Sequence, residues 1–203
     1  MLFVYASRNR ECVCTLTMNP VVPIRGKEMP TWFVMRDLRR ANAKEHAVDI
    51  LAARGYEVFT PLVVRTKTER GRKVTVKRPF ISDLLFVYAT RMALDPVVSE
   101  LDFLQYRFIR GGRMGEVMQV REDEMQAFMR AVSSDAPFQY FKPEEVSPAM
   151  YGKKIRIVGG TLDGLEGRLM SRRGSKVRRL LVDMGGLLSA GVEVEPEYIQ
   201  LVD

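Results

Sequence analysis

Apolar and polar residues alternate with different periods along the chain, and these periods predict a mixed α/β region followed by a β-rich region. Apolar runs at Trp32–Met35 and Leu84–Tyr88 predict buried strands, and the second run is apolar enough to be central in a sheet. Alternating runs at Tyr56–Thr60 and Leu104–Ile109 predict two further strands. After residue 150 the helical period disappears, and short strands alternate with glycine-rich turns.

Three helices are predicted between these strands. Asn42 followed by Glu45 forms a capping-box pattern, so a helix is expected from about that point until a glycine stops it. The pair Asp95-Pro96 predicts the start of a short helix. Residues 121–132 have a helical period that is acidic in the first turn and basic near the end, as the helix dipole favours.

A basic hairpin is predicted between the strands expected at Tyr56–Thr60 and Leu84–Tyr88. Val63–Thr68 and Lys73–Lys77 are rich in β-branched residues, and Gly71 supplies the positive φ that a tight turn needs. Residues 65–78 carry seven cations and one carboxylate, a net +6 in a chain whose formal net charge is +7. This distribution indicates contact with a polyanion at one place, and the alternative is an ordinary solvated hairpin.

The order of elements predicts an α+β protein: an N-terminal α/β sandwich with a mostly antiparallel sheet, followed by a small β-barrel. The expected domains are residues 31–133 and residues 150–203. Residues 134–149 hold three prolines among polar residues and are expected to be a linker. Residues 1–30 lack a sustained period and are expected to be a disordered arm or a misannotated start, since Met18 and Met29 offer later starts.

Composition narrows the functional classes. The chain has 203 residues, of which 46% are hydrophobic and 28% charged, and no apolar run approaches the ~18 residues that span a bilayer. Cys12 and Cys14 do not suggest a disulfide framework, and the single histidine, His46, cannot complete a zinc site. No nucleophile, base or phosphate loop is recognisable. We therefore expect a cytoplasmic, monomeric protein that is not an enzyme, binds no metal or cofactor and does not contact membranes.

The most specific motif lies near the C-terminus. In residues 158–169, VGGTLDGLEGRL, glycines recur where strands must reverse. The stretch resembles the KOW motif, which implies an SH3-like β-barrel of the kind found in NusG and in some ribosomal proteins. Thr161-Leu162 replaces the usual Pro-Phe pair, and Met184 stands where NusG usually places an aromatic that binds partner proteins. The residues implied in binding a partner or RNA are Arg172, Arg173, Lys176, Arg178 and Met184.

The preceding domain resembles the NusG N-terminal domain, especially its operon-restricted relatives RfaH and UpxY. The resemblance rests on residues 32–34 (WFV), 44–46 (KEH), 59–61 (FTP) and 80–87 (FISDLLFV). It implies docking on the clamp helices of the largest RNA polymerase subunit through Phe80, Ile81, Leu84 and Phe86. Since strand side chains alternate, we expect Leu84 and Phe86 on one face and Leu85 and Val87 on the other, one face being core and the other interface.

The same resemblance implies contacts with nucleic acid. The residues implied in DNA binding are Arg39, Arg40 and His46 near the first helix, and Lys67, Arg70, Arg72 and Lys73 on the hairpin, facing non-template DNA. The implied function is transcription antitermination on a surface (capsular) polysaccharide operon, with RNA polymerase, non-template DNA, nascent RNA and a ribosomal protein or other factor as partners. The alternatives are a housekeeping NusG-type elongation factor and a ribosomal-type RNA-binding KOW protein.

Overall fold

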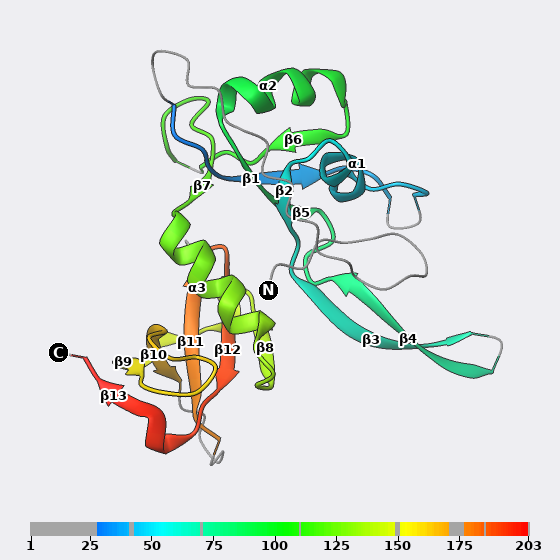
Figure 1. Cartoon of the computed structure of the whole chain (residues 1–203). Helices are drawn as coiled ribbons and strands as arrows, with labels where there is room; N and C mark the ends of the chain where they lie inside the picture. Colours follow the sequence, from blue (N-terminus) through cyan, green and yellow to red (C-terminus); the bar gives the residue numbers. More distant parts are fainter. Residues whose placement is uncertain are drawn as a thin grey trace. The chain divides into compact units, whose positions relative to one another are not determined.

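The computed structural model describes residues 28–40, 43–69, 71–109, 111–148, 151–170, 177–184 and 186–202. The fold comprises two compact units that divide between Gln119 and Val120 (Figure 1). Each unit is described by itself. The expectations for residues 1–27, including Cys12 and Cys14, fall outside the described residues.

The first unit is built on a sheet whose four main strands pair antiparallel. The order of strands is β2-β5-β1-β6, and β7 pairs with β1. The strands are β1 (Thr31–Asp37), β2 (Glu57–Phe59), β5 (Leu84–Ala89), β6 (Leu104–Tyr106) and β7 (Gln119–Val120). The prediction of a central strand at Leu84–Tyr88 is confirmed, because β5 lies between β2 and β1.

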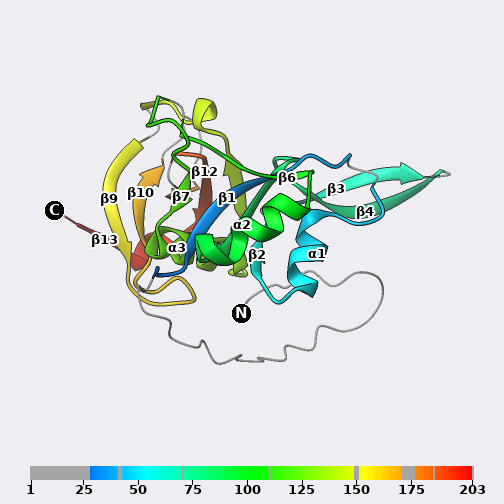
Figure 2. The ribbon, with the colours of Figure 1, turned by 90° about the horizontal axis from the view of Figure 1, so that it is seen from above.

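Two helices, α1 (Ala47–Ala53) and α2 (Arg91–Glu100), cover one face of this sheet (Figures 1 and 2). Apolar residues of both helices and of strands β1 and β5 form one buried cluster, whose members include Phe33, Met35, Ala47, Leu51, Leu85, Val87, Leu94 and Val97. Burial of these side chains is the main force that holds the helices on the sheet.

Both helices begin elsewhere than the sequence patterns predict. Helix α1 starts at Ala47, with His46 as its N-cap residue and Asp49 bonding back to the His46 amide. Asn42, the expected cap, lies outside the described residues. Helix α2 starts before Asp95, because the Thr90 hydroxyl accepts a hydrogen bond from the Ala93 amide and caps the helix there. Pro96 is consequently inside α2.

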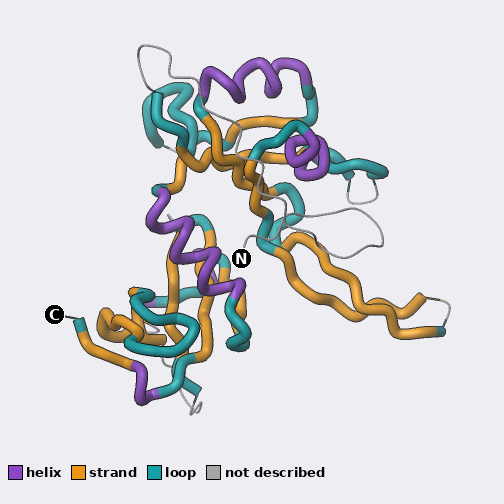
Figure 3. The backbone as a smooth tube through the Cα atoms, in the orientation of Figure 1, coloured by secondary structure: helices purple, strands orange, loops and turns teal. Residues whose placement is uncertain are grey.

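The predicted hairpin is confirmed as a separate two-stranded sheet, which we call the basic ribbon. It consists of β3 (Leu62–Glu69) and β4 (Arg72–Pro79), paired antiparallel along their whole length (Figure 3). Gly71 has φ 77° in the turn, as the sequence predicts. The Phe80 amide donates to the Pro61 carbonyl at 2.8 Å and closes the base of the ribbon.

The second unit is an antiparallel sheet with the order β13-β9-β10-β11-β12-β8. Its elements are α3 (Glu122–Ser133), β8 (Phe138–Phe141), the 3₁₀ turn η1 (Pro143–Glu145), β9 (Tyr151–Ile157), β10 (Glu166–Met170), β11 (Arg179–Met184), β12 (Leu188–Glu193), the 3₁₀ turn η3 (Pro196–Tyr198) and β13 (Ile199–Leu201). The C-terminal strands are confirmed, but the expected closed barrel is not shown. Among the described strands no pairing joins β8 to β13.

Helix α3 packs on β11 and β12, and its buried residues are Met125, Phe128, Met129 and Ala131. The Phe128 ring stacks on Tyr140 of β8 with centroids 6.0 Å apart. These contacts place α3 in the second unit, although its sequence position predicts that it belongs to the first domain. The expected linker, residues 134–149, likewise contains strand β8 and η1.

The glycine-rich turn of the second unit meets two different steric demands. Gly159, Gly160 and Gly164 have positive φ, as the sequence predicts for sharp reversals. Gly167 in β10 is required for another reason: a Cβ there would lie 2.4 Å from the Leu181 carbonyl oxygen of β11. The absence of a side chain at this position therefore lets two strands approach closely.

Candidate functional site

The sheet face opposite α1 and α2 carries aromatic and aliphatic side chains from three adjacent strands. In the antiparallel register Trp32 lies opposite Tyr88, and Phe86 lies opposite both Val34 and Phe59. The Trp32 and Tyr88 ring centroids are 5.3 Å apart, and those of Phe59 and Phe86 are 6.2 Å apart. We call this set the aromatic face: Trp32, Val34, Phe59, Leu84, Phe86 and Tyr88.

The structure divides the four residues expected to dock on RNA polymerase. Leu84 and Phe86 share one face, with Leu85 and Val87 on the other, as predicted. However, Leu84 is 2% and Phe86 0% exposed, so both side chains are buried here, and docking through them stays a prediction. In β5 residues 84–87 are buried whichever face they occupy.

Phe80 and Ile81 lie outside the strands, in the turn between β4 and β5, and both are half-buried. The Leu84 amide donates to the Ile81 carbonyl at 3.2 Å, which fixes the turn at the start of β5. Of the four expected docking residues, these two are therefore the ones with solvent-accessible side chains.

Asp83, in the same turn, joins two arginines of other segments. Its carboxylate accepts hydrogen bonds from Arg36 Nε and from an Arg107 guanidinium nitrogen, each at 2.9 Å. Arg36 is on β1 directly opposite Leu84, so this cluster borders the aromatic face. The Asp37 amide also donates to the Asp83 carbonyl at 3.0 Å. The one local signal of this cluster in the sequence is an acidic residue, Asp83, directly before the most apolar strand.

A second carboxylate, Asp37, organises the start of α1. It accepts hydrogen bonds from the Ala47 amide at 2.8 Å and from the Arg39 amide at 2.9 Å, and His46 Nδ1 lies 3.3 Å from it. His46 is thus held against a buried carboxylate, and its side chain is 36% exposed. This arrangement gives His46 a structural role in α1, and its expected DNA contact stays a prediction.

The two arginines expected beside His46 differ in their surroundings. The Arg39 guanidinium lies over the Phe103 ring, 3.6 Å from its centroid, and donates to the Glu45 carbonyl at 2.5 Å. These contacts fix Arg39 against its own unit as a cation–π pair. Arg40 is exposed on the surface. Its expected DNA contact also stays a prediction.

The hairpin residues expected to bind DNA are exposed on the basic ribbon. Lys67 of β3 and Arg72 and Lys73 of β4 all have exposed side chains, and Arg70 lies outside the described residues. Successive residues of a strand point to opposite sides, so Arg72 and Lys73 are on different faces of the ribbon.

Of the five residues expected to form a contact site in the second unit, the structure describes Arg178 and Met184. Met184 is 0% exposed and belongs to the core, so it cannot act as a surface contact in this structure. The reason is its position in β11, where residues 180, 182 and 184 alternate with the exposed Asp183 and are all buried. Arg178 is exposed, while Arg172, Arg173 and Lys176 lie outside the described residues.

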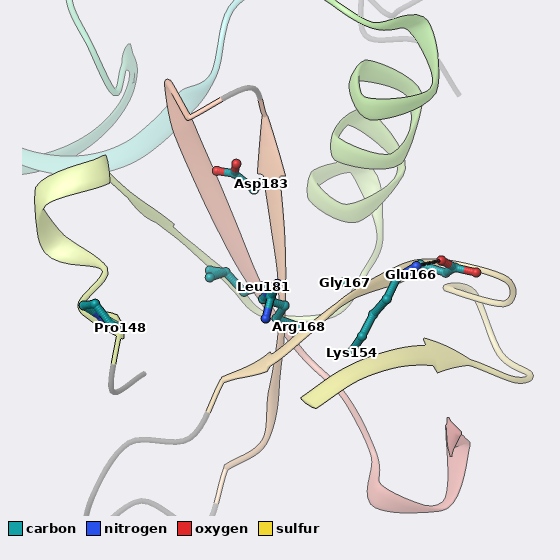
Figure 4. Close-up of a pocket in the computed structure, with 7 residues that line it drawn as sticks. All are labelled: Pro148, Lys154, Glu166, Gly167, Arg168, Leu181 and Asp183. Carbon is teal, nitrogen blue, oxygen red and sulfur yellow. Dashed lines mark ion pairs between the residues drawn. The ribbon is translucent and has the colours of Figure 1, made fainter. Parts of the chain in front are cut away.

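A shallow hollow lies on strands β9, β10 and β11 of the second unit, and Figure 4 shows the residues that line it. Lys154 and Glu166 face each other across β9 and β10, with their charged atoms 2.8 Å apart. A hydrogen bond from Lys154, which has the largest effect, and a second one from Arg156 lower the pKa of the Glu166 carboxyl. The cations of this hollow are therefore partly neutralised by a neighbouring carboxylate.

The described residues include no cluster of metal ligands and no helix that could span a membrane. No three His, Cys, Asp or Glu side chains among those residues are close enough to hold a metal ion. No helix within the described ranges has the length and apolar character needed to span a bilayer.

Comparison with known proteins finds one matching family model. Residues 30–129 match the NusG family model, described as transcription termination factor nusG. No curated protein matches the chain. NusG family members are transcription factors rather than enzymes, and they generally bind RNA polymerase. The matched segment contains the sheet, α1, α2 and the basic ribbon. Residues 30–129 of the chain are therefore similar to the NusG family.

Proposed function

We propose that this protein is a transcription elongation and antitermination factor that acts by binding RNA polymerase. The observation that carries the proposal is the NusG family match over a sheet whose two helices cover one face and whose other face is aromatic. A factor of this kind needs no catalytic group. Binding across two parts of the polymerase favours one of its conformations, and the population shift alone suppresses pausing.

The proposed docking element is the turn at Phe80 and Ile81, next to the aromatic face. Both side chains are half-buried, so each offers apolar surface to a partner while its backbone is held by the base of the ribbon and the start of β5. Partly exposed apolar side chains on a rigid turn suit the apolar stripe of an amphipathic helix. The partner proposed for them is the pair of clamp helices in the largest polymerase subunit.

The basic ribbon supplies the proposed second contact, with DNA at the transcription bubble. Its exposed cations favour phosphate, and it is tethered to the unit that carries Phe80 and Ile81. Restriction to a capsular polysaccharide operon is a further part of the proposal and rests on the resemblance to UpxY. Genome-wide occupancy tests it: enrichment confined to one operon supports restriction, and enrichment over most genes supports the housekeeping alternative.

The docking element is tested by capture of purified RNA polymerase on the immobilised full chain. The variant Phe80→Ser/Ile81→Ser removes the apolar atoms of the turn and leaves the buried strand residues intact. We expect at least a tenfold loss of affinity, corresponding to about 1.4 kcal/mol. Leu84 and Phe86 are unsuitable for this purpose, because substitution of buried residues would destabilise the unit itself.

A matched control is Met92→Ser on α2, which removes an apolar side chain that is 74% exposed. Its polymerase binding should equal that of the unmodified chain. Circular dichroism and thermal unfolding establish that both variants are folded. Undiminished capture by a folded Phe80→Ser/Ile81→Ser variant would rule out this docking element.

A further inference from the structure

The two faces of the basic ribbon differ in charge. Residues directly opposite each other in an antiparallel pair share a face, and the register pairs Val63 with Arg78, Arg65 with Val76, Lys67 with Val74 and Glu69 with Arg72. This face therefore carries four cations, which we call the basic row: Arg65, Lys67, Arg72 and Arg78. The same pairings put valines beside the cations and Glu69 at the end of the ribbon.

The cations of the basic row are evenly spaced. Arg65 and Lys67 are two residues apart on β3, which is about 6.6 Å along an extended strand. Arg78 lies diagonally across from Arg65, and Arg72 diagonally across from Lys67, distances of about 7–8 Å. The order Arg78, Arg65, Lys67, Arg72 thus forms a continuous line of positive charge from the base of the ribbon towards its turn.

The opposite face has fewer cations and no such line. There Lys77 is paired with Val64 and Lys73 with Thr68, and the uncharged pair Thr66–Thr75 separates them. Four residues along β4 put about 13 Å between the two lysines. Side chains on this face are exposed as well, so the difference between the faces is one of charge pattern rather than of access.

The ribbon has no aromatic residue in either strand. Proteins that hold single-stranded nucleic acid stack its bases on aromatic side chains, and such a platform is missing from β3 and β4. A two-stranded ribbon is also narrow enough to lie in the major groove of B-form DNA, where its cations reach the flanking phosphates. Both observations favour a duplex over an unpaired strand.

We propose that the basic row is a binding surface for the phosphates of duplex DNA, and that the Thr66–Thr75 face is turned away from it. This inference rests on the proposed function, and it adds the form of the nucleic acid and the face that contacts it. Contacts with phosphates carry no sequence information, so the proposed contact is independent of sequence.

The experiment measures affinity of the full chain for a labelled duplex of about two helical turns and for single-stranded poly-dT, over a series of salt concentrations. Two variants remove the same charge from opposite faces: Arg65→Gln/Arg78→Gln from the basic row, and Lys73→Gln/Lys77→Gln from the other face. A third, Arg65→Lys/Arg78→Lys, keeps the charge of the row. All four positions are exposed, so the fold is preserved.

For the unmodified chain we expect tighter binding to the duplex than to poly-dT. Loss of two phosphate contacts lowers the slope of log affinity against log salt by about 1.8. When salt rises from about 50 to about 200 mM, binding by the variant therefore weakens by a factor about twelvefold smaller than binding by the unmodified chain. The Arg65→Gln/Arg78→Gln variant should show this change. The Lys73→Gln/Lys77→Gln and Arg65→Lys/Arg78→Lys variants should retain a slope close to the original.

An equal decrease of the slope in both glutamine variants would overturn the assignment to one face. General electrostatic attraction would then account for the binding. Tighter binding to poly-dT would overturn the assignment to duplex DNA. Absence of duplex binding by the unmodified chain would overturn the inference altogether. Capture of RNA polymerase, measured on the same preparation, then shows whether the proposed function fails with it.

Discussion

Asp37 at the end of β1 and Ala47 at the start of α1 are joined by a hydrogen bond, although they are ten residues apart in the sequence. The Ala47 amide donates to Asp37 Oδ2 at 2.8 Å, so a strand residue caps the helix. The Arg39 amide donates to the other oxygen of the same carboxylate at 2.9 Å. One side chain therefore fixes both the end of the strand and the beginning of the helix.

Replacement of Asp37 by alanine should destabilise the first unit. The Ala47 and Arg39 amides would lose their acceptor in a site where Asp37 is 9% exposed. Loss of a helix cap costs about 0.5–2 kcal/mol, and we expect the upper part of this range. The free energy of unfolding in urea measures it, with the exposed Asp102→Ala as control. A stability equal to that of the control would contradict the capping role.

The hydrogen bond between Tyr106 and Asp95 predicts a dependence on alkaline pH. The Tyr106 hydroxyl donates to Asp95 at 2.7 Å. Burial is the largest cause, and this hydrogen bond the second, of a pKa of Tyr106 that is raised above its ordinary value of 10.0. The folded chain therefore holds the proton more tightly than the unfolded chain. This contribution to stability is complete below about pH 10 and is lost as pH rises towards the raised pKa.

The variant Tyr106→Phe isolates this effect. At neutral pH it should be about 1 kcal/mol less stable than the unmodified chain, the usual contribution of one hydrogen bond. Above about pH 10 the difference between the two should narrow, since only the unmodified chain loses this contribution. The exposed Tyr198→Phe serves as control. A difference that stays constant with pH would show that Tyr106 does not titrate in this range.

Met184 provides a test of core position against surface contact. Because Met184 is 0% exposed, Met184→Ala should lower the free energy of unfolding by about 2–5 kcal/mol. The same substitution at Met114, which is fully exposed, should change it by less than about 0.5 kcal/mol. Calorimetry of the full chain compares the two. A negligible effect at position 184 would restore Met184 as a candidate contact.

Local sequence patterns predicted the elements whose determinants are local. The strand at Leu84–Tyr88 is set by its own apolar residues, and the hairpin is set by β-branched strands around Gly71. The start of α1 is different, because its cap comes from Asp37 on a preceding strand. A capping-box pattern at Asn42 and Glu45 cannot reveal an acceptor that only the tertiary fold brings to the helix.

The same difference between local patterns and tertiary packing explains why the sequence does not reveal which surfaces are buried. Alternation correctly predicts that Leu84 and Phe86 share a face, but it does not reveal whether that face is buried. The helical period of residues 121–132 likewise predicts an apolar stripe without identifying the sheet that receives it. In the structure that sheet is the one containing β11 and β12. Burial and domain membership depend on packing between distant segments, which periodicity does not encode.

The basic ribbon shares no strand pairing with either larger sheet in the described part of the chain. Substitutions on its exposed faces consequently leave the core clusters untouched. Natural selection can therefore lengthen, shorten or recharge the ribbon with little penalty in folding. A change in the charge of the ribbon would therefore alter whatever contact it makes without altering the sheet and helices of the first unit.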